Sequence, residues 1–255
     1  GFIIVSLLFS IIRYLLISFK MSTGIKTFII GATGLVGNAF YKEADQSKAF
    51  SQLFTLSRRE LLYKSKTGKT VSIIDKDSDN WDKVIEEAVK KEKISVFFSG
   101  LATTRKEANG FDNQYKIDHD MNLKLAKAAK ASGIETYILI SSMGASKDSR
   151  LPYLKMKGEL DDEIIDLKFP RTIIVRPGVL VGERDKDKGF LNNAVNYLGG
   201  KIHGTFLNGL MYPIYDYEIG KAVVDLIEKQ PTVAGNSGDK PSVTILTPTE
   251  LSEIL

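Results

Sequence analysis

The sequence predicts an α/β protein built on a doubly wound parallel sheet, and three observations lead to this prediction. An apolar run at residues 27–30 leads directly into three glycines spaced three apart. Short β-branched or aromatic runs then alternate with longer amphipathic stretches along the chain. With 255 residues, the chain suits one large α/β domain. Such alternation is typical of a parallel sheet covered by helices.

The glycine turn at residues 31–37 is the strongest local signal. Residues 28–30 suit a buried parallel strand, because they are aromatic and β-branched. Gly31 permits a sharp turn, Gly34 permits close approach of a pyrophosphate, and Gly37 permits close packing of the next helix. A helix that starts at Leu35 would direct free N–H groups at the phosphates. The turn therefore predicts a dinucleotide site, although a tight turn without a ligand would use the same glycines.

Composition excludes several classes of function. The 35 basic and 31 acidic residues give a net charge of +4, which is not typical of a nucleic-acid-binding protein. The chain has no cysteine, so disulfides, zinc–thiolate sites and thiol catalysis are excluded. Its histidines are His119 and His203 alone. A histidine-rich metal centre is therefore not expected, and no metal site is predicted.

The first twenty residues are strongly apolar. Residues 2–19 are nearly continuous Ile, Leu, Phe and Val, with Arg13 inside the run. An arginine near the bilayer centre costs about 2.5 to 3.5 kcal/mol, which several Leu and Ile residues can offset. Residues 1–20 could be a membrane anchor, a targeting peptide, or no native part of the protein, because the chain opens on Gly1 and Met21 stands just before the fold. We therefore assign the nucleotide-binding fold to residues 21–255, as a single domain.

The remaining elements follow from hydrophobic periodicity. Further strands are predicted at residues 53–56, 71–74, 94–98, 137–140 and 243–246. Helices are predicted at residues 35–48, 81–90 and 115–132, with another starting near Tyr153 and a last one within 213–227. Residues 190–212 contain four glycines, which indicates a small, flexible lobe on the substrate side.

The end of the second strand selects the dinucleotide. An acidic residue at this place accepts hydrogen bonds from the adenosine ribose and repels a 2′-phosphate. This sequence instead has Arg58 and Arg59. The pair suits a 2′-phosphate and so favours NADP(H) over NAD(H). The alternative is that both arginines, with the lysines that follow, only solvate a surface loop.

A second candidate cofactor contact follows the fourth strand. The run at residues 99–105 begins with serine and glycine and continues through Leu101, Ala102 and Thr103. Small residues at the carboxyl end of a parallel strand let the backbone pass close to a cofactor ribose.

A reactive group of side chains follows the fifth strand. If a helix starts near Tyr153, this residue and Lys157 are four apart and share one face. A lysine ammonium beside a phenol favours the phenolate, so the tyrosine can exchange a proton with a substrate carbonyl oxygen. The hydroxyl of Ser142, or with less support that of Ser141, would hold that oxygen in place. Taken singly these residues are ordinary surface and turn residues, and it is their order behind the glycine turn that is specific.

Together these motifs resemble the short-chain dehydrogenase/reductase superfamily in its extended or atypical branch, which has a Rossmann-like fold. The sequence is more closely similar to the Tat-interacting-protein group of NADPH-binding members, and to the fungal mitochondrial outer-membrane proteins related to that group. The resemblance covers residue 27 to the C-terminus. The motifs that carry it are the stretches at residues 31–37, 101–105, 141–145, 153–159 and 176–180.

The resemblance implies a role for each matching position. It implies that the pyrophosphate is held by Gly31, Thr33, Gly34, Leu35, Val36 and Gly37. It implies that Arg58 and Arg59 meet the 2′-phosphate and that Tyr153 and Lys157 hold the nicotinamide ribose. The backbone of Pro177, Gly178 and Val179 would face the carboxamide.

One position departs from the pattern of the superfamily. Many members carry a helix-kinking asparagine where this sequence has Asp118. In those members the asparagine supports a water-mediated proton path, so the departure favours a nucleotide-binding protein over an enzyme.

Two functions of different classes are therefore expected. The first is an NADPH-dependent oxidoreductase, a carbonyl reductase acting on a small carbonyl substrate, with Ser142, Tyr153 and Lys157 as its catalytic residues. The second is an NADPH-sensing regulatory protein that changes its affinity for a protein partner. The resemblance implies a place on the cytosolic face of the mitochondrial outer membrane, by peripheral or N-terminal anchoring.

Overall fold

The protein is built around one parallel sheet. The computed structural model describes residues 24–181, 214–231 and 240–255. Seven strands pair in the order β3-β2-β1-β4-β5-β6-β9, and every pair is parallel. The strands are β1 (Ile25–Ile30), β2 (Phe50–Ser57), β3 (Thr70–Ile74), β4 (Val96–Ser99), β5 (Thr136–Ile140), β6 (Arg171–Val175) and β9 (Ser242–Leu246). The predicted doubly wound Rossmann-like sheet is confirmed.

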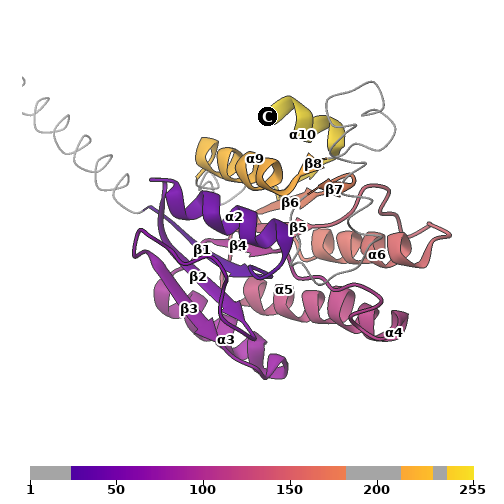
Figure 1. Ribbon diagram of the computed structural model, residues 1–255, viewed down its shortest axis with the longest axis horizontal. Helices are drawn as coiled ribbons and strands as arrows, with labels where there is room; N and C mark the ends of the chain where they lie inside the picture. The colour runs from indigo at the N-terminus through magenta and orange to yellow at the C-terminus, as the bar shows by residue number, and fades with distance from the viewer. Residues whose placement is uncertain (1–23, 182–213, 232–239) are drawn as a thin grey trace, which may run out of the picture.

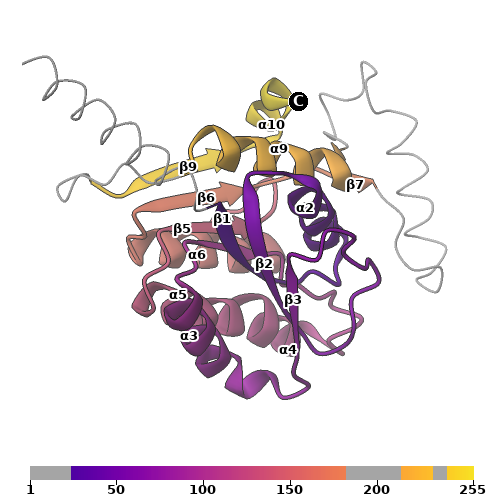
Figure 2. The ribbon, with the colours of Figure 1, turned by 90° about the vertical axis from the view of Figure 1, so that its left-hand side faces the viewer.

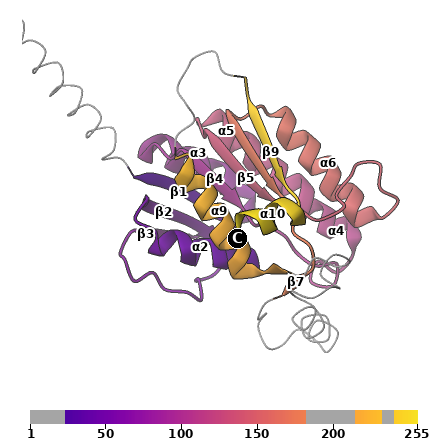
Figure 3. The same ribbon diagram turned by 90° about the horizontal axis from the view of Figure 1, so that it is seen from above.

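Helices cover both faces of the sheet, as Figures 1 and 2 show. One face carries α2 (Leu35–Gln46) and α9 (Asp216–Lys229), and the short α10 (Pro248–Ile254) lies beside α9 (Figure 3). The other face carries α3 (Trp81–Glu92), α5 (Asn122–Ala131) and α6 (Pro152–Asp166). A single 3-10 turn, Ser78–Asn80, precedes α3.

The central strands are apolar along their length because both of their faces are buried. Neighbouring residues of β4 show this directly: Phe97 stacks on Phe28 with ring centroids 5.5 Å apart, and Phe98 stacks on Phe40 at 4.1 Å. Successive side chains of a strand point to opposite faces, so these two rings belong to the two separate apolar clusters of the core. The sheet is thus packed against apolar side chains on both of its faces.

Residues 58–69 join β2 to β3 as a crossover loop without a helix, and no helix was predicted in this interval. One predicted helix differs from the structure. The helix predicted at residues 115–132 begins earlier, as α4 (Phe111–Tyr115), and passes through a π-helical segment, Lys116–Met121, before α5. Gly133 follows the end of α5 with φ of 100°, as its place after a helix terminus predicts.

A second, two-stranded sheet pairs β7 (Leu180–Val181) with β8 (Ile214–Tyr215). The flexible lobe predicted at residues 190–212 and the apolar segment at residues 1–20 lie outside the described residues. Within the described ranges, no helix is long and apolar enough to cross a bilayer.

Candidate nucleotide site at the carboxyl edge of the sheet

The order of the strands reverses between β1 and β4, and the candidate site lies at this point. From β1 the chain moves outward through β2 and β3, then returns to place β4 on the other side of β1. The backbone N–H of Gly100, just after β4, donates to the carbonyl of Ile30 at 3.0 Å. Open α/β sheets bind ligands in the crevice outside the strand ends at such a reversal.

Two glycines of the turn lie so close to neighbouring backbone that no other residue would fit. Gly31 has φ of 80°, and a Cβ on it would lie 2.3 Å from the carbonyl carbon of Gly100. A Cβ on Gly37 would lie 2.2 Å from the carbonyl oxygen of Gly31. The turn, the start of α2 and the end of β4 therefore touch backbone to backbone, which no larger residue permits.

Gly34 has a different environment. A Cβ there would meet only the Gly31 oxygen at 3.2 Å and the Gly100 oxygen at 3.9 Å. Gly34 is exposed at the N-terminus of α2, where no side chain caps the helix. Uncapped helical N–H groups beside an open glycine suit a phosphate. Of the neighbouring candidates, Thr33 and Leu35 are half-buried, whereas the Val36 side chain belongs to the core and can offer only its backbone.

The two arginines lie at the carboxyl end of β2, exposed, as predicted. Ser57 is buried, and its hydroxyl donates to the carbonyl of Arg59 at 2.6 Å. This bond closes the backbone of the turn that displays both guanidinium groups. In the described part of the chain, neither Arg58 nor Arg59 forms an ion pair.

Polar side chains of the π-helical segment and its flanking turns hold the loop at residues 101–103. The N–H of Thr103 donates to Oδ1 of Asp118 at 2.6 Å, and the Thr103 carbonyl accepts from the side-chain amide of Gln114 at 3.1 Å. The amide of Asn122 donates to the carbonyls of both Leu101 and Asp118 at 3.0 Å. The backbone of the candidate ribose loop is thereby fixed in place, with the Ala102 side chain exposed.

The π-helical segment places Asp118 inside the protein. A π-helix widens the helix by one residue per turn and is frequent at functional sites. The Asp118 side chain is fully buried. Burial raises the pKa of its carboxyl to about 6, even though the Lys157 ammonium and the hydrogen bonds from Thr103 and Gln114 favour the ionised form.

Tyr153 and Lys157 lie in the first two turns of α6, which begins at Pro152. They are four residues apart on one helix, so they share a face as the spacing predicts. Tyr153 is 39% exposed, whereas Lys157 is only 1% exposed. The ammonium of Lys157 donates to the carbonyl of Ile140, the last residue of β5, at 3.0 Å. The lysine is therefore anchored to the strand end, and the tyrosine stands at the surface of the site.

The charge of Lys157 is balanced by two buried carboxylates. Burial lowers the pKa of the ammonium, and the nearby carboxylates of Asp118 and Asp161 oppose this shift. Asp161 is one turn further along α6 and is also fully buried. A buried ammonium near two carboxylates and bonded to a carbonyl is held in one position.

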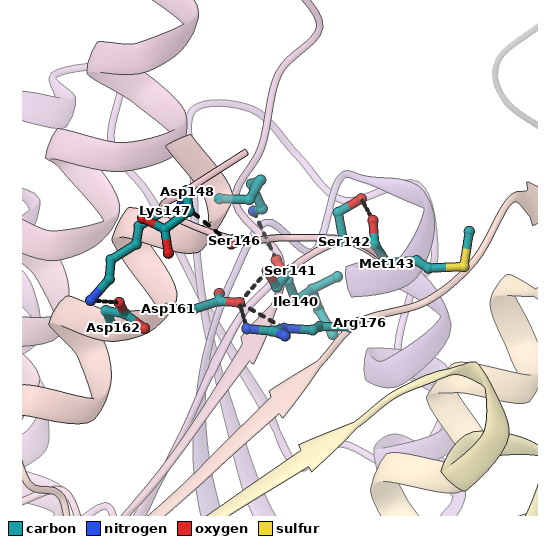
Figure 4. Close-up of polar contacts among 11 residues, drawn as sticks. Ile140, Ser141, Ser142, Met143, Ser146, Lys147, Asp148, Asp161, Asp162 and Arg176 are labelled. Atoms are coloured by element: carbon teal, nitrogen blue, oxygen red, sulfur yellow. Dashed lines mark hydrogen bonds and ion pairs between the residues drawn. The ribbon is translucent and has the colours of Figure 1, made fainter. Parts of the chain in front are cut away.

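The two serines after β5 point to different surroundings (Figure 4). The hydroxyl of buried Ser141 donates to Oδ2 of Asp161 at 2.9 Å. The same oxygen accepts from Nε of Arg176 at 2.9 Å and forms an ion pair with its terminal nitrogen at the same distance. Ser142 is half-buried, and its one hydrogen bond within the described residues is a long contact, 3.4 Å, to the carbonyl of Met143. Ser142, not Ser141, therefore has a hydroxyl available to a ligand.

The segment after β6 joins neighbouring loops through its carbonyls. The Pro177 carbonyl accepts from the N–H of Met143 at 2.9 Å, and the Val179 carbonyl accepts from the N–H of Ile214 at 3.0 Å. Pro177, Gly178 and Val179 thus lie beside the loop that carries Ser142. Among the described residues, no group of three or more acidic or histidine side chains could hold a metal ion.

Three buried polar residues of the site were missed by sequence reasoning: Gln114, Asn122 and Asp161. Asn122 lies four residues after Asp118 on the same helical face, which was the available signal. Asp161 likewise lies four residues after Lys157. Each would normally be assigned to a solvated helix face, because nothing local shows that a loop carbonyl or an arginine lies opposite.

Comparison with known structures shows which class of fold this is. The structure superposes on MoeE5 in complex with UDP-glucuronic acid and NAD with a TM-score of 0.63 and 16% identity, covering 87% of this chain and 75% of that one. For UDP-glucose 4-epimerase with UDP-glucose from Thermotoga maritima the TM-score is 0.61 at 12% identity, covering 87% and 76%. The protein has the fold of the extended short-chain dehydrogenase/reductase class.

The sequence comparisons are more specific. A family model described as NAD(P)H-binding matches residues 31–204. The chain is 43% identical over 227 residues to Protein FMP52-1, mitochondrial, of Scheffersomyces stipitis, which covers 89% of this chain and 97% of that protein. It is 44% identical over 201 residues to Protein FMP52, mitochondrial, of Saccharomyces cerevisiae, covering 78% and 85%. The chain therefore belongs to the NAD(P)H-binding family and to the group of the fungal FMP52 proteins.

Proposed function

We propose that this protein is an NADP(H)-dependent oxidoreductase that reduces a carbonyl group of a small substrate. The observation that carries the proposal is the placement of Tyr153 at the surface of the site, on the same helical face as the buried, anchored ammonium of Lys157. Lys157 is bonded to the carboxyl end of β5, at the same edge of the parallel sheet at which the open Gly34 turn follows β1.

The residues present fit a phosphorylated dinucleotide. The uncapped start of α2 and the space at Gly34 would receive the pyrophosphate. Arg58 and Arg59 would receive the 2′-phosphate, which a planar guanidinium can bind with two parallel hydrogen bonds. The loop at residues 101–103, Tyr153, Lys157 and the backbone of residues 177–179 would border the ribose and the nicotinamide.

Side chains of the protein carry out the proton transfer in this proposal. When bound, NADPH supplies the hydride for the carbonyl carbon. Tyr153 donates a proton to the carbonyl oxygen, and the positive charge of Lys157 stabilises the phenolate that results. Ser142 donates a hydrogen bond to the same oxygen and holds it beside the phenol. Because Ser141 is bonded to Asp161, it does not compete for this role.

A second function is favoured by Asp118. Asp118 stands where the superfamily resemblance implies an asparagine, and its carboxylate accepts hydrogen bonds from Thr103 and Gln114. If this exchange interrupts proton supply to the site, the protein would bind NADPH without turnover and signal its presence to a protein partner.

A location is supported by the relatives, which are named as mitochondrial proteins. In this proposal the protein lies on the cytosolic face of the mitochondrial outer membrane, held peripherally or by residues 1–20. The proposal treats residues 21–255 as one domain, supported by the membership of β1 and β9 in a single sheet. Protease treatment of intact mitochondria should digest the protein, and carbonate extraction with and without residues 1–20 should show whether that segment anchors it.

The first experiment is calorimetric titration of the full chain with NADPH and with NADH. The wild type should prefer NADPH, and the Arg58→Ala, Arg59→Ala double variant should lose that preference by weakening NADPH alone. If neither nucleotide binds, the glycine turn has only an architectural role and both functions are refuted.

The second experiment separates enzyme from sensor. A panel of aldehydes and ketones is screened for NADPH consumption by the wild type and by Tyr153→Phe. The variant should keep its NADPH affinity and lose turnover. Consumption by the wild type that never exceeds that of Tyr153→Phe would favour the sensor.

A further inference from the structure

The crossover loop at residues 58–69 has an unusual anchor. Parallel strands are normally joined through a helix that covers the sheet, but this loop packs against the end of α2 instead. The loop is hydrogen-bonded there to the carboxylate of Asp45, the penultimate residue of α2. The Asp45 side chain is fully buried.

Asp45 accepts hydrogen bonds from four groups of the loop. Oδ1 accepts from the hydroxyls of Ser65 at 2.7 Å and Thr67 at 2.5 Å. Oδ2 accepts from the hydroxyl of Tyr63 at 2.9 Å and from the backbone N–H of Lys66 at 3.3 Å. One side chain therefore binds residues 63–67 as a unit.

The four donors are uncharged, and they keep the carboxylate ionised. Burial alone would raise the pKa of Asp45, but the hydrogen bonds from Thr67, Ser65 and Tyr63 outweigh it, so the pKa lies below the usual value. The carboxylate accepts these bonds at full negative charge, which makes them stronger than neutral ones.

Apolar contacts support the same stretch of the loop. Leu61 is buried in the core cluster that includes α2. The ring of Tyr63 meets that of Tyr41 edge-on, with centroids 5.4 Å apart, and the Tyr41 hydroxyl donates to Thr70 at 3.0 Å. The loop is thus fixed from residue 61 to the start of β3.

Arg58 and Arg59 lie in the short exposed interval between two fixed points. On one side is buried Ser57, which bonds the carbonyl of Arg59. On the other side are Leu61 and the part of the loop bound by Asp45. Loss of the second fixed point would leave both guanidinium groups on a chain free to turn away from the strand end.

We propose that Asp45 is a positioning residue that determines the preference for a 2′-phosphorylated dinucleotide, through the loop that carries Arg58 and Arg59. The proposal rests on the proposed NADP(H) function and adds a residue that would not touch the nucleotide.

The test is Asp45→Asn in the full chain, titrated with NADPH and with NADH. Asparagine keeps the size of the side chain but removes its charge and one of its two acceptor oxygens. We expect the Kd for NADPH to rise about tenfold and the Kd for NADH to change less than about twofold, as loss of a bound phosphate contact predicts. Asp225→Asn, which removes a partly exposed carboxylate of α9 paired with Lys221, should change neither Kd.

A double-mutant cycle identifies the route of the effect. In the Arg58→Ala, Arg59→Ala background, Asp45→Asn should not weaken NADPH binding further, because residues that act through one contact are not additive. If Asp45→Asn folds poorly, Thr67→Val removes a single donor and should shift the preference in the same direction by a smaller factor. Amide hydrogen exchange at residues 60–67 should accelerate in both variants.

The outcomes are distinguishable. Equal weakening of NADPH and NADH, an unchanged preference, or an additive effect in the arginine-free background would each overturn the role of Asp45 while leaving NADPH binding by the wild type intact. Absence of NADPH binding by the wild type would instead overturn the proposed function.

Discussion

Oδ1 of Asp118 accepts a 2.6 Å hydrogen bond from the backbone N–H of Thr103, and so the π-helical segment is joined to the loop after β4. Burial raises the pKa of the Asp118 carboxyl, so this side chain is harder to ionise than an exposed aspartate. Above its pKa, the protein must hold a buried negative charge for which Lys157 is the neighbouring cation. Ionisation of Asp118 therefore makes the free energy of unfolding depend on pH.

The first prediction concerns Asp118→Asn. In the unfolded chain the carboxyl titrates near its ordinary pKa of 3.8, whereas in the folded protein its pKa is raised to about 6. As pH rises from about 4 to about 6, the unfolded chain releases its proton first, so the wild type loses stability, and the full cost is present above the folded pKa. Asp118→Asn removes this cost and should be more stable than the wild type by about 1 to 3 kcal/mol at pH 7, with little difference at pH 4.

Urea unfolding at several pH values tests this prediction. Asp112→Asn, at an exposed carboxyl of α4, is the matched control and should track the wild type at every pH. A stability difference for Asp118→Asn that is constant from pH 4 to pH 7 would show that the buried charge is not its origin.

The second prediction separates the roles of two glycines. Gly37→Ala would place a Cβ 2.2 Å from the Gly31 oxygen, so it should destabilise the fold by about 1 to 3 kcal/mol, as overpacking does. Gly34 has an extended backbone, φ of −86°, with open space around most of its Cβ position. Gly34→Ala should therefore change stability by less than about 1 kcal/mol.

Nucleotide titration completes the comparison. Gly34→Ala should weaken NADPH binding at least about tenfold, because its methyl group would stand where a phosphate approaches. Thermal melts and calorimetry on both variants are sufficient. If Gly34→Ala binds NADPH like the wild type, the pyrophosphate does not lie at this turn.

The third prediction concerns Asn122, which joins Ser99, Leu101 and Asp118 in the interior. The Ser99 hydroxyl donates to its Oδ1 at 2.5 Å, and its amide donates to two carbonyls. Asn122→Leu leaves these buried groups without partners, and each unsatisfied group costs about 1 to 3 kcal/mol. We expect a loss of more than about 2 kcal/mol by urea unfolding, against about 1 kcal/mol for Ser99→Ala, which removes a single bond.

The two losses should also be coupled. Because Ser99 and Asn122 share a bond, the double variant should lose less than the sum of the single variants. Fully additive losses would show that the bond between the two side chains contributes nothing to stability.

The sheet could be predicted from the sequence because its signals are local. The strands are continuous apolar runs. The glycine spacing is required because the backbone at Gly31 and at Gly37 lies too close to neighbouring backbone for a Cβ to fit. The crossover loop could not be predicted in the same way. Its conformation depends on Asp45, and an acidic residue near the end of an amphipathic helix normally indicates exposure to solvent.

The π-helical segment could not be predicted from the sequence either, because it also depends on tertiary contacts. One extra residue in a helical turn leaves the apolar periodicity on either side nearly unchanged, so residues 115–132 predict a single regular helix. The insertion is stabilised by tertiary partners, the loop at residues 101–103 and Lys157, which the sequence does not place beside it. The candidate proton donor and its lysine were predictable as a motif, but the buried groups that position them were not.

The last prediction uses the two serines after β5 as a matched pair. Ser141→Ala removes a buried donor from Asp161, whose other oxygen, Oδ1, is buried without a hydrogen-bond partner among the described residues. It should therefore cost about 1 to 2 kcal/mol of stability. Among the described residues, Ser142→Ala removes just a 3.4 Å contact, so it should leave stability within about 0.5 kcal/mol of the wild type. For a carbonyl substrate found in the screen, Ser142→Ala should lower kcat by about 10²-fold, as loss of one donor to a developing oxyanion does, whereas Ser141→Ala should retain most of kcat once folded. The reverse pattern, with turnover lost in Ser141→Ala and kept in Ser142→Ala, would assign the substrate oxygen to the buried serine and require Asp161 to release it.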